Sequence, residues 1–245
     1  MSSKLSALPA SARTVHTVSA ATHLVVAIAL GALSVAQASI LLPVTLSVPF
    51  GDSVEPFARV DFAAAAAIVV LVGAAAHATL ALIAADDGVR SRLLQLVAFA
   101  QASGITLFLV AQVNGVTEAG ALILVYAFGG GAAGLLWLQA RESDDRLRAR
   151  WPFSFGAGLA VVPWGVVALY QVVAVVAGAP PAPIVRVLTV VVLFIAALAW
   201  WVERRWQLGM TSAQRAAVLH STLSVANGIA LLVLAAGLTR SSALL

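Results

Sequence analysis

Histidine and serine side chains stand inside otherwise apolar stretches of the chain, where they could form hydrogen bonds or exchange protons. In the first stretch, His16, Ser19 and His23 recur at spacings that place them on one face of a helix. His77 stands between two alanines in the second stretch. Two interpretations stay open: a small polar cavity at His23 and His77, or hydrogen bonds that only join the helices.

Charged groups are missing from the centres of all the apolar stretches. The ten acids stand at the ends of stretches or in loops, and the one lysine of the chain is Lys4. A carboxylate proton relay, a carboxylate cation site and an intramembrane Schiff base would therefore lack the group that each requires. The chain has no cysteine and none of the common hydrolase, P-loop or zinc motifs, which predicts neither catalytic nor metal-binding residues.

The composition predicts a membrane protein, with the lipid bilayer as its main partner. Apolar residues make up 62% of the 245 residues, charged residues only 10%, and the mean hydropathy is +1.02. A soluble domain is nearer half apolar and a quarter charged, so a soluble enzyme and a nucleic-acid-binding protein are excluded. The net charge of +4 arises from arginines beside apolar runs, where they anchor helices to headgroups.

Seven apolar stretches predict an all-α bundle of seven transmembrane helices forming a single domain over residues 1–245. Each is long enough to cross about 30 Å of hydrocarbon as a helix. The predicted spans are residues 14–36, 62–84, 93–113, 119–140, 153–177, 184–202 and 213–238.

The distribution of cationic residues predicts the orientation of this bundle. Eleven Lys and Arg residues lie in the amino-terminal tail and the even-numbered loops, against three on the other side. By the positive-inside rule, the amino terminus is cytoplasmic and the carboxyl terminus lies outside. We therefore expect an integral, multi-pass protein of the plasma membrane.

Two loops have distinctive compositions. Alternating residues from Leu42 to Val48, in the long first outer loop, favour a short strand or hairpin, although an irregular linker is an equal alternative. The highly charged run Arg141–Arg150 is typical of a solvated loop and could also dock a cytoplasmic protein. In the fourth span, Gly130 and Gly134 have the spacing that allows close approach of a neighbouring helix or protomer.

Several local motifs resemble the heliorhodopsins, and the resemblance extends over essentially the whole chain. The most specific is the run Arg-Trp-Pro-Phe-Ser-Phe-Gly over 150–156, followed by Val162-Pro163-Trp164. His23 and His77 resemble the paired histidines of that family's cytoplasmic-side polar cavity. The resemblance implies a rhodopsin-like bundle with a cytoplasmic amino terminus, a β-ribbon in the first outer loop, and a homodimer.

The two charges that carry that family's chemistry do not match. The family binds retinal through a lysine in its seventh helix, balanced by a glutamate in its third. Here Asn227 falls at the lysine position and Val97 at the counterion position. A buried ion pair can be replaced by two neutral residues at little cost, whereas loss of one partner is expensive. The remaining residues predicted to line the pocket are Gln101, Gly131, Gly134, Trp164 and Ser224.

The sequence therefore predicts a non-pumping heliorhodopsin-like protein that has no covalent cofactor and acts through partners or as a regulatory module. The alternative is a receptor or carrier that holds retinal, a carotenoid or another lipophilic ligand without a covalent bond. Small residues beside apolar walls favour this alternative.

Overall fold

The computed structural model describes residues 10–36, 40–46, 56–83, 88–141 and 151–242. Lys4 and residues 142–150 of the charged loop lie outside these ranges. The described part of the chain forms two strands, β1 (Leu41–Thr45) and β2 (Pro56–Asp61), and seven helices. These helices are α1 (Ala10–Ala36), α2 (Phe62–Ile83), α3 (Gly88–Val113), α4 (Ala119–Arg141), α5 (Trp151–Val176), α6 (Pro183–Gln207) and α7 (Ala213–Ser242).

All seven helices are long and apolar enough to cross a membrane, which indicates an integral multi-pass membrane protein. The predicted seven-helix bundle is thus confirmed, and the helices depart from the predicted spans by a few residues at their ends. The departure that matters most is at α6, which continues to Gln207 although its span was predicted to end at Val202. This extension includes Glu203, which was expected at the end of the span.

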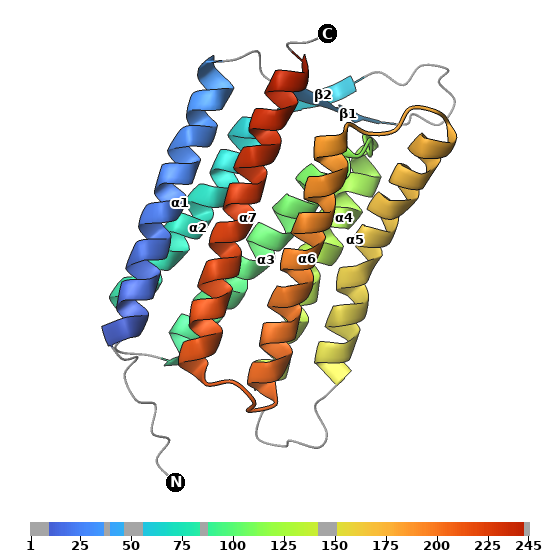
Figure 1. The fold of residues 1–245 in the computed structure, drawn as a ribbon. Coiled ribbons are helices and arrows are strands. Elements are labelled where there is room, and N and C mark those ends of the chain that lie inside the picture. The colour runs from blue at the N-terminus through green and yellow to red at the C-terminus, as the bar shows by residue number, and fades with distance from the viewer. Residues whose placement is uncertain (1–9, 37–39, 47–55, 84–87, 142–150, 243–245) are drawn as a thin grey trace.

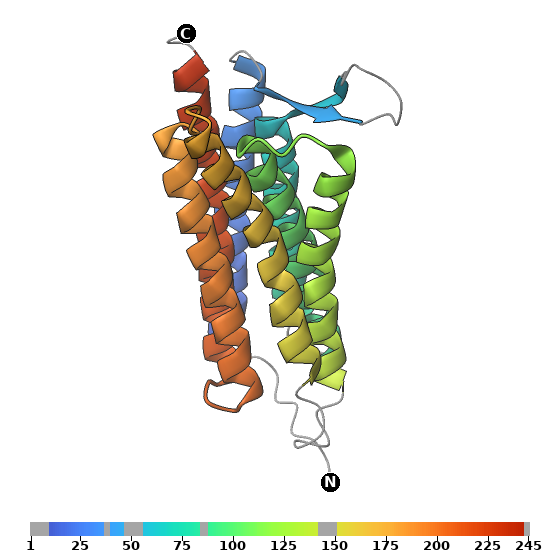
Figure 2. The same ribbon diagram turned by 90° about the vertical axis from the view of Figure 1, so that its right-hand side faces the viewer.

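The helices run alternately up and down, and neighbours in sequence lie side by side (Figures 1 and 2). The bundle closes where α7 packs against both α1 and α2, and α3 contacts α2, α4, α5 and α6. We call the end where α1 begins the amino end and the opposite end, which carries the strands, the ribbon end (Figure 1). Groups on α3 and α7 therefore face several helices at once.

The two strands form an antiparallel ribbon over the ribbon end, with Leu42 paired to Val60. This confirms the hairpin interpretation of the first long loop. The backbone N–H of Thr45 donates to the carbonyl of Thr117 at 2.8 Å, which fastens the ribbon to the segment before α4. Asp61 caps α2 by accepting the N–H of Ala64 at 3.0 Å.

Two buried apolar clusters hold the helices together, mostly in the ribbon half of the bundle. One joins α1, α2 and α7 in the ribbon half and includes Leu30, Phe62 and Leu231. The other is centred on α3, α4 and α5 and includes Val110 and Leu122. Gly104 and Gly129 meet where α3 and α4 approach closely, since a Cβ on Gly129 would lie 3.4 Å from Cα of Gly104.

Candidate functional site: a cavity between α3, α5, α6 and α7

A cavity of about 400 Å³ lies among α2, α3, α5, α6 and α7, with His16 contributed by α1. Most of its wall is apolar, and on α5 and α6 the lining side chains are small at Ala157, Ala160 and Ala196. Val161 and Leu193 line the cavity and are also 66% and 39% exposed on the outside of the bundle. The wall between cavity and membrane is therefore thin where α5 faces α6.

Asn227 of α7 lines this cavity and is hydrogen-bonded to α3. Its amide nitrogen Nδ2 donates to Oγ1 of Thr106 at 3.0 Å, and Thr106 also lines the cavity. Both groups are neutral and each satisfies the other, so the contact leaves no uncompensated charge in the span. It joins α7 to α3 at the depth where Asn227 was predicted to stand.

Three histidines gather on the α1–α2–α7 side of the cavity. Nδ1 of His16 and Nδ1 of His77 are 3.1 Å apart, so one ring donates a proton and the other accepts it. The His23 and His77 ring centroids are 5.1 Å apart, and His16 and His77 both line the cavity. A Cβ on Gly73 would stand 2.8 Å from the His23 ring, so glycine is needed for His23 to approach α2 this closely.

Both ring nitrogens of His23 are hydrogen-bonded to groups of α1 and α7. Its Nδ1 lies 2.7 Å from the carbonyl oxygen of Ser19, which can only accept, so Nδ1 carries the proton. Its Nε2 then accepts from the hydroxyl of Ser224 at 2.9 Å. The predicted polar cavity at His23 and His77 is met only in part: the two rings lie close together beside His16, but His16 and His77 line the cavity and His23 does not.

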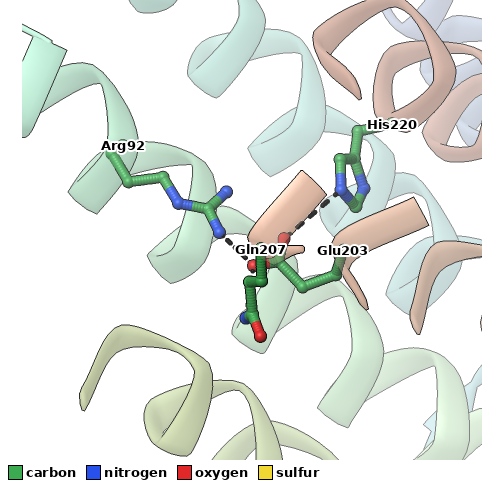
Figure 3. A network of polar contacts seen from close by, with 4 residues as sticks. All are labelled: Arg92, Glu203, Gln207 and His220. Atoms are coloured by element: carbon green, nitrogen blue, oxygen red, sulfur yellow. Dashed lines mark hydrogen bonds and ion pairs between the residues drawn. The ribbon is translucent and has the colours of Figure 1, made fainter. Parts of the chain in front are cut away.

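A buried ionic cluster stands at the amino end of the cavity (Figure 3). The guanidinium of Arg92, on α3, donates to Oε1 of Glu203, on α6. Gln207 donates to the same oxygen at 2.9 Å, and Nε2 of His220, on α7, lies 3.5 Å from Oε2. The Trp206 ring covers the Arg92 guanidinium at 3.9 Å. The Glu203 side chain is 2% exposed, so this cluster ties α3, α6 and α7 together through a desolvated charge.

The sequence alone does not predict this cluster, because Glu203 stands where an apolar run ends. Two signals were present. Glu203 and Gln207 are four residues apart and face the same side of a continued helix, and Trp206 supplies an aromatic ring beside them. Thr106, the partner of Asn227, was also missed as a site residue, because its importance depends on which face of α3 meets α7.

Trp164, Ser224 and Asn227 line the cavity, as predicted. Val97 does not: it is 50% exposed and lies outside the cavity wall. At about 100° per residue, Val97 and Thr106 point to opposite faces of α3, and Thr106 is the one that meets Asn227. The structure thus places Val97 on the face of α3 away from Asn227, whereas its neighbours Leu96 and Ala98 line the cavity.

Gln101, Gly131 and Gly134 also lie outside the cavity wall. Gln101 is exposed and accepts a hydrogen bond from the Tyr126 hydroxyl at 2.9 Å on the outer side of α3 and α4. A Cβ on Gly131 or Gly134 would meet nothing within 4 Å, since both glycines are exposed. The glycine of α4 that lines the cavity is Gly129, because the helical phase turns it toward α3.

The chain is similar to one known protein family. The family model described as Heliorhodopsin matches residues 7–207, which include α1 to α6 and end before α7 begins. No curated protein matches the chain.

Proposed function

Because the chain belongs to the heliorhodopsin family, we propose that it is a member that binds no retinal covalently, pumps no ions and acts through partners or as a regulatory module. The observation that carries this proposal is the contact between Asn227 and Thr106, at 3.0 Å. It occupies the cavity-facing side of α7, where the resemblance places the family's lysine. An imine needs a primary amine, and residues 10–242 contain no lysine.

The absence of pumping is proposed from the charges that line the cavity. Among the described lining residues, the one carboxylate is Glu203, and it is paired with Arg92 at the amino end. Reversible transfer of a proton needs a group whose charge can alternate, and a carboxylate held by a guanidinium favours its ionised form. Among the described lining residues this leaves His16, His77 and His220 as groups that could change charge, with no free carboxylate to exchange a proton with them. We assign the chain no catalytic reaction.

The test is to add all-trans-retinal to the purified chain in lipid nanodiscs and record the visible spectrum. We expect no hydroxylamine-sensitive band and no retinyl adduct after borohydride reduction. Empty nanodiscs control for retinal dissolved in lipid. An adduct on any residue of the chain, located by peptide mass spectrometry, would refute the proposal.

A second function is favoured by the cavity itself. A largely apolar space of about 400 Å³ falls within the range of small-molecule sites, and α5 and α6 line it with alanines as well as with apolar side chains such as Trp164 and Trp200. The chain would then be a non-covalent receptor or carrier of a lipophilic molecule. Native mass spectrometry of the protein extracted from its membrane should show a bound mass, and an Ala160→Phe variant should lose it.

We also propose a homodimer with α4, α5 and the first outer loop at the contact, as the family resemblance implies. On the outer face of α4, Gly131 and Gly134 are exposed, whereas Gly130 faces α3, where a Cβ would lie 3.3 Å from the Ala100 carbonyl oxygen. Gly134→Ile should therefore weaken the dimer and leave the fold intact. Cross-linking in membranes measures the dimer. The matched control is Gly31→Ile on α1, away from the proposed contact, where an added Cβ would also meet nothing within 4 Å.

The amino end is proposed to face the cytoplasm of a plasma-membrane protein, as the excess of cationic residues at that end favours. The chain has no cysteine, so single cysteines report the topology directly. In intact cells, an impermeant maleimide should label Ala179→Cys, in the α5–α6 turn, and leave Ser212→Cys, in the α6–α7 turn, unlabelled. The reverse pattern would refute the orientation.

A further inference from the structure

His16 is a buried polar residue of the cavity that stands outside the ionic cluster and whose hydrogen bonding is incomplete. Within that cluster, Nε of Arg92 and Nε2 of His220 also lack a hydrogen-bond partner among the described residues. The His16 side chain is 1% exposed and lines the cavity, and its Nε2 has no hydrogen-bond partner among the described residues. The other ring nitrogen is engaged by His77 at 3.1 Å. A buried imidazole nitrogen without a hydrogen-bond partner destabilises the fold. A ligand group that fits the cavity and hydrogen-bonds to Nε2 would remove this penalty and so bind more tightly.

The tautomer of the His16–His77 pair decides which groups can pair with Nε2. If Nδ1 of His16 donates to His77, Nε2 of His16 is an acceptor; if His77 donates, Nε2 is an N–H donor. A hydroxyl satisfies both cases because it donates and accepts. An aldehyde oxygen can only accept, so it satisfies one case.

The charges beside His16 disfavour an acidic head group. The one guanidinium among the described lining residues, Arg92, is already paired with Glu203 and covered by Trp206. A carboxylate ligand would therefore be desolvated without a free guanidinium or ammonium among these lining residues to balance it. A neutral head group avoids this cost.

The depths of the residues that line the cavity fit an amphipathic molecule. His16 stands three residues into the span Arg13–Ala36, about 5 Å from its start. Val161 and Leu193, which line the cavity on α5 and α6, stand ten residues into their spans, near mid-membrane. Figure 1 shows α1 and α5 on opposite sides of the bundle, so His16 and these apolar residues line different sides of the cavity.

We infer that the cavity binds a long-chain or polyene alcohol, with its hydroxyl on Nε2 of His16 and its apolar tail between α5 and α6. The inference rests on the proposed non-covalent use of the cavity and adds the head-group chemistry. The hydroxyl lies toward the amino end and the tail reaches mid-membrane, which is the arrangement of a lipid in one leaflet.

The test compares four probes that share one polyene tail: all-trans-retinol, all-trans-retinal, all-trans-retinoic acid, and the hydrocarbon in which a methyl group replaces the CH₂OH. Binding to the full chain in nanodiscs is measured by quenching of tryptophan fluorescence, because Trp164 and Trp200 line the cavity. Empty nanodiscs correct for partition into lipid. We expect retinol to bind most tightly, and the acid and the hydrocarbon at least about fivefold more weakly.

Two variants locate the head and the tail. His16→Phe should weaken retinol binding by about two- to tenfold, the range of one hydrogen bond, and leave the hydrocarbon unchanged. Thr17→Val, at an exposed neighbouring position, is the matched control. Ala160→Phe should abolish binding of all four probes.

Equal affinity for retinol and the hydrocarbon in the unmodified chain would overturn the inference even if His16→Phe fails to fold. Retinoic acid binding as tightly as retinol, no binding of any probe, or retinol binding that survives Ala160→Phe would also overturn it. A borohydride-stable retinal adduct refutes the proposed function instead, so the two failures are distinguishable.

Discussion

Two of the polar contacts between α3 and later helices use opposite chemistry. Near the amino end Arg92 forms an ion pair with Glu203 of α6, while about 21 Å farther along α3 the hydroxyl of Thr106 accepts from Asn227 of α7. The ionic contact stands close to the end of its helices, where headgroups and water reduce the cost of charge. The neutral contact stands near the middle of α7.

The difference shows at which depth this bundle tolerates charged side chains. Arg92 keeps 15% of its side chain exposed and stacks on Trp206, so its charge is only partly desolvated. At mid-membrane both charges of an ion pair would lose their water, so each would need full compensation by its partner and by hydrogen bonds. A neutral amide–hydroxyl pair has no charge to compensate. Three substitutions test this contrast, in decreasing order of expected effect.

Glu203→Leu should have the largest effect on stability. It leaves the Arg92 guanidinium and the His220 ring beside an apolar side chain, and loss of one partner of a buried ion pair costs about 3–5 kcal/mol. We expect the lower end of this range, because Arg92 is partly exposed. Thermal unfolding in detergent, followed by circular dichroism, measures the shift in Tm.

The double variant Arg92→Leu with Glu203→Leu is the control for that experiment. Removing both charges should restore most of the lost stability. If the double variant is as unstable as the single one, the cluster contributes through packing rather than charge, and the contrast with the neutral contact disappears.

Asn227→Lys should have the next largest effect, because it places an unpaired ammonium near mid-membrane. The expected cost is about 2.5–3.5 kcal/mol. Adding Thr106→Glu should recover part of it, since Thr106 is the residue of α3 that meets Asn227. With added retinal, the Lys–Glu double variant should develop a hydroxylamine-sensitive visible band.

The matched control is Asn227→Lys with Val97→Glu. Val97 is 50% exposed on the opposite face of α3, so its carboxylate cannot balance the new charge. Equal recovery and equal colour in both double variants would contradict the geometry of the Asn227–Thr106 contact.

The arrangement of the helices was predictable from the sequence, because each apolar stretch must satisfy its backbone hydrogen bonds internally within the membrane. The ribbon was predictable from the alternation beginning at Leu42. The extent of α6 was not. Hydropathy detects an apolar run, whereas the backbone continues as helix through the charged residues from Glu203 to Gln207.

The prediction of the site was limited because the sequence does not show which face of each helix points into the cavity. Asn227, Ser224 and Trp164 were placed correctly in the cavity wall, but Val97 and Gln101 were assigned by resemblance to a stretch of α3 and point away from it. An apolar helix in lipid has little amphipathic contrast, so the sequence does not mark which face is buried. Only packing against neighbouring helices decides that.

Thr106→Val should have the smallest effect of the three. It removes the acceptor of the Asn227 amide while keeping the shape of the side chain, and interhelical hydrogen bonds of this kind average about 0.6 kcal/mol. The companion Asn227→Leu and the double variant complete a double-mutant cycle.

We expect a coupling energy below about 1.5 kcal/mol between Thr106 and Asn227, and a larger one between Arg92 and Glu203 in the same assay. These two values would quantify the contrast between the neutral and the ionic contact. A coupling equal to that of the ion pair would mean that the bundle depends on its central neutral pair as strongly as on its peripheral charges, because the low dielectric around Asn227 strengthens even a neutral hydrogen bond.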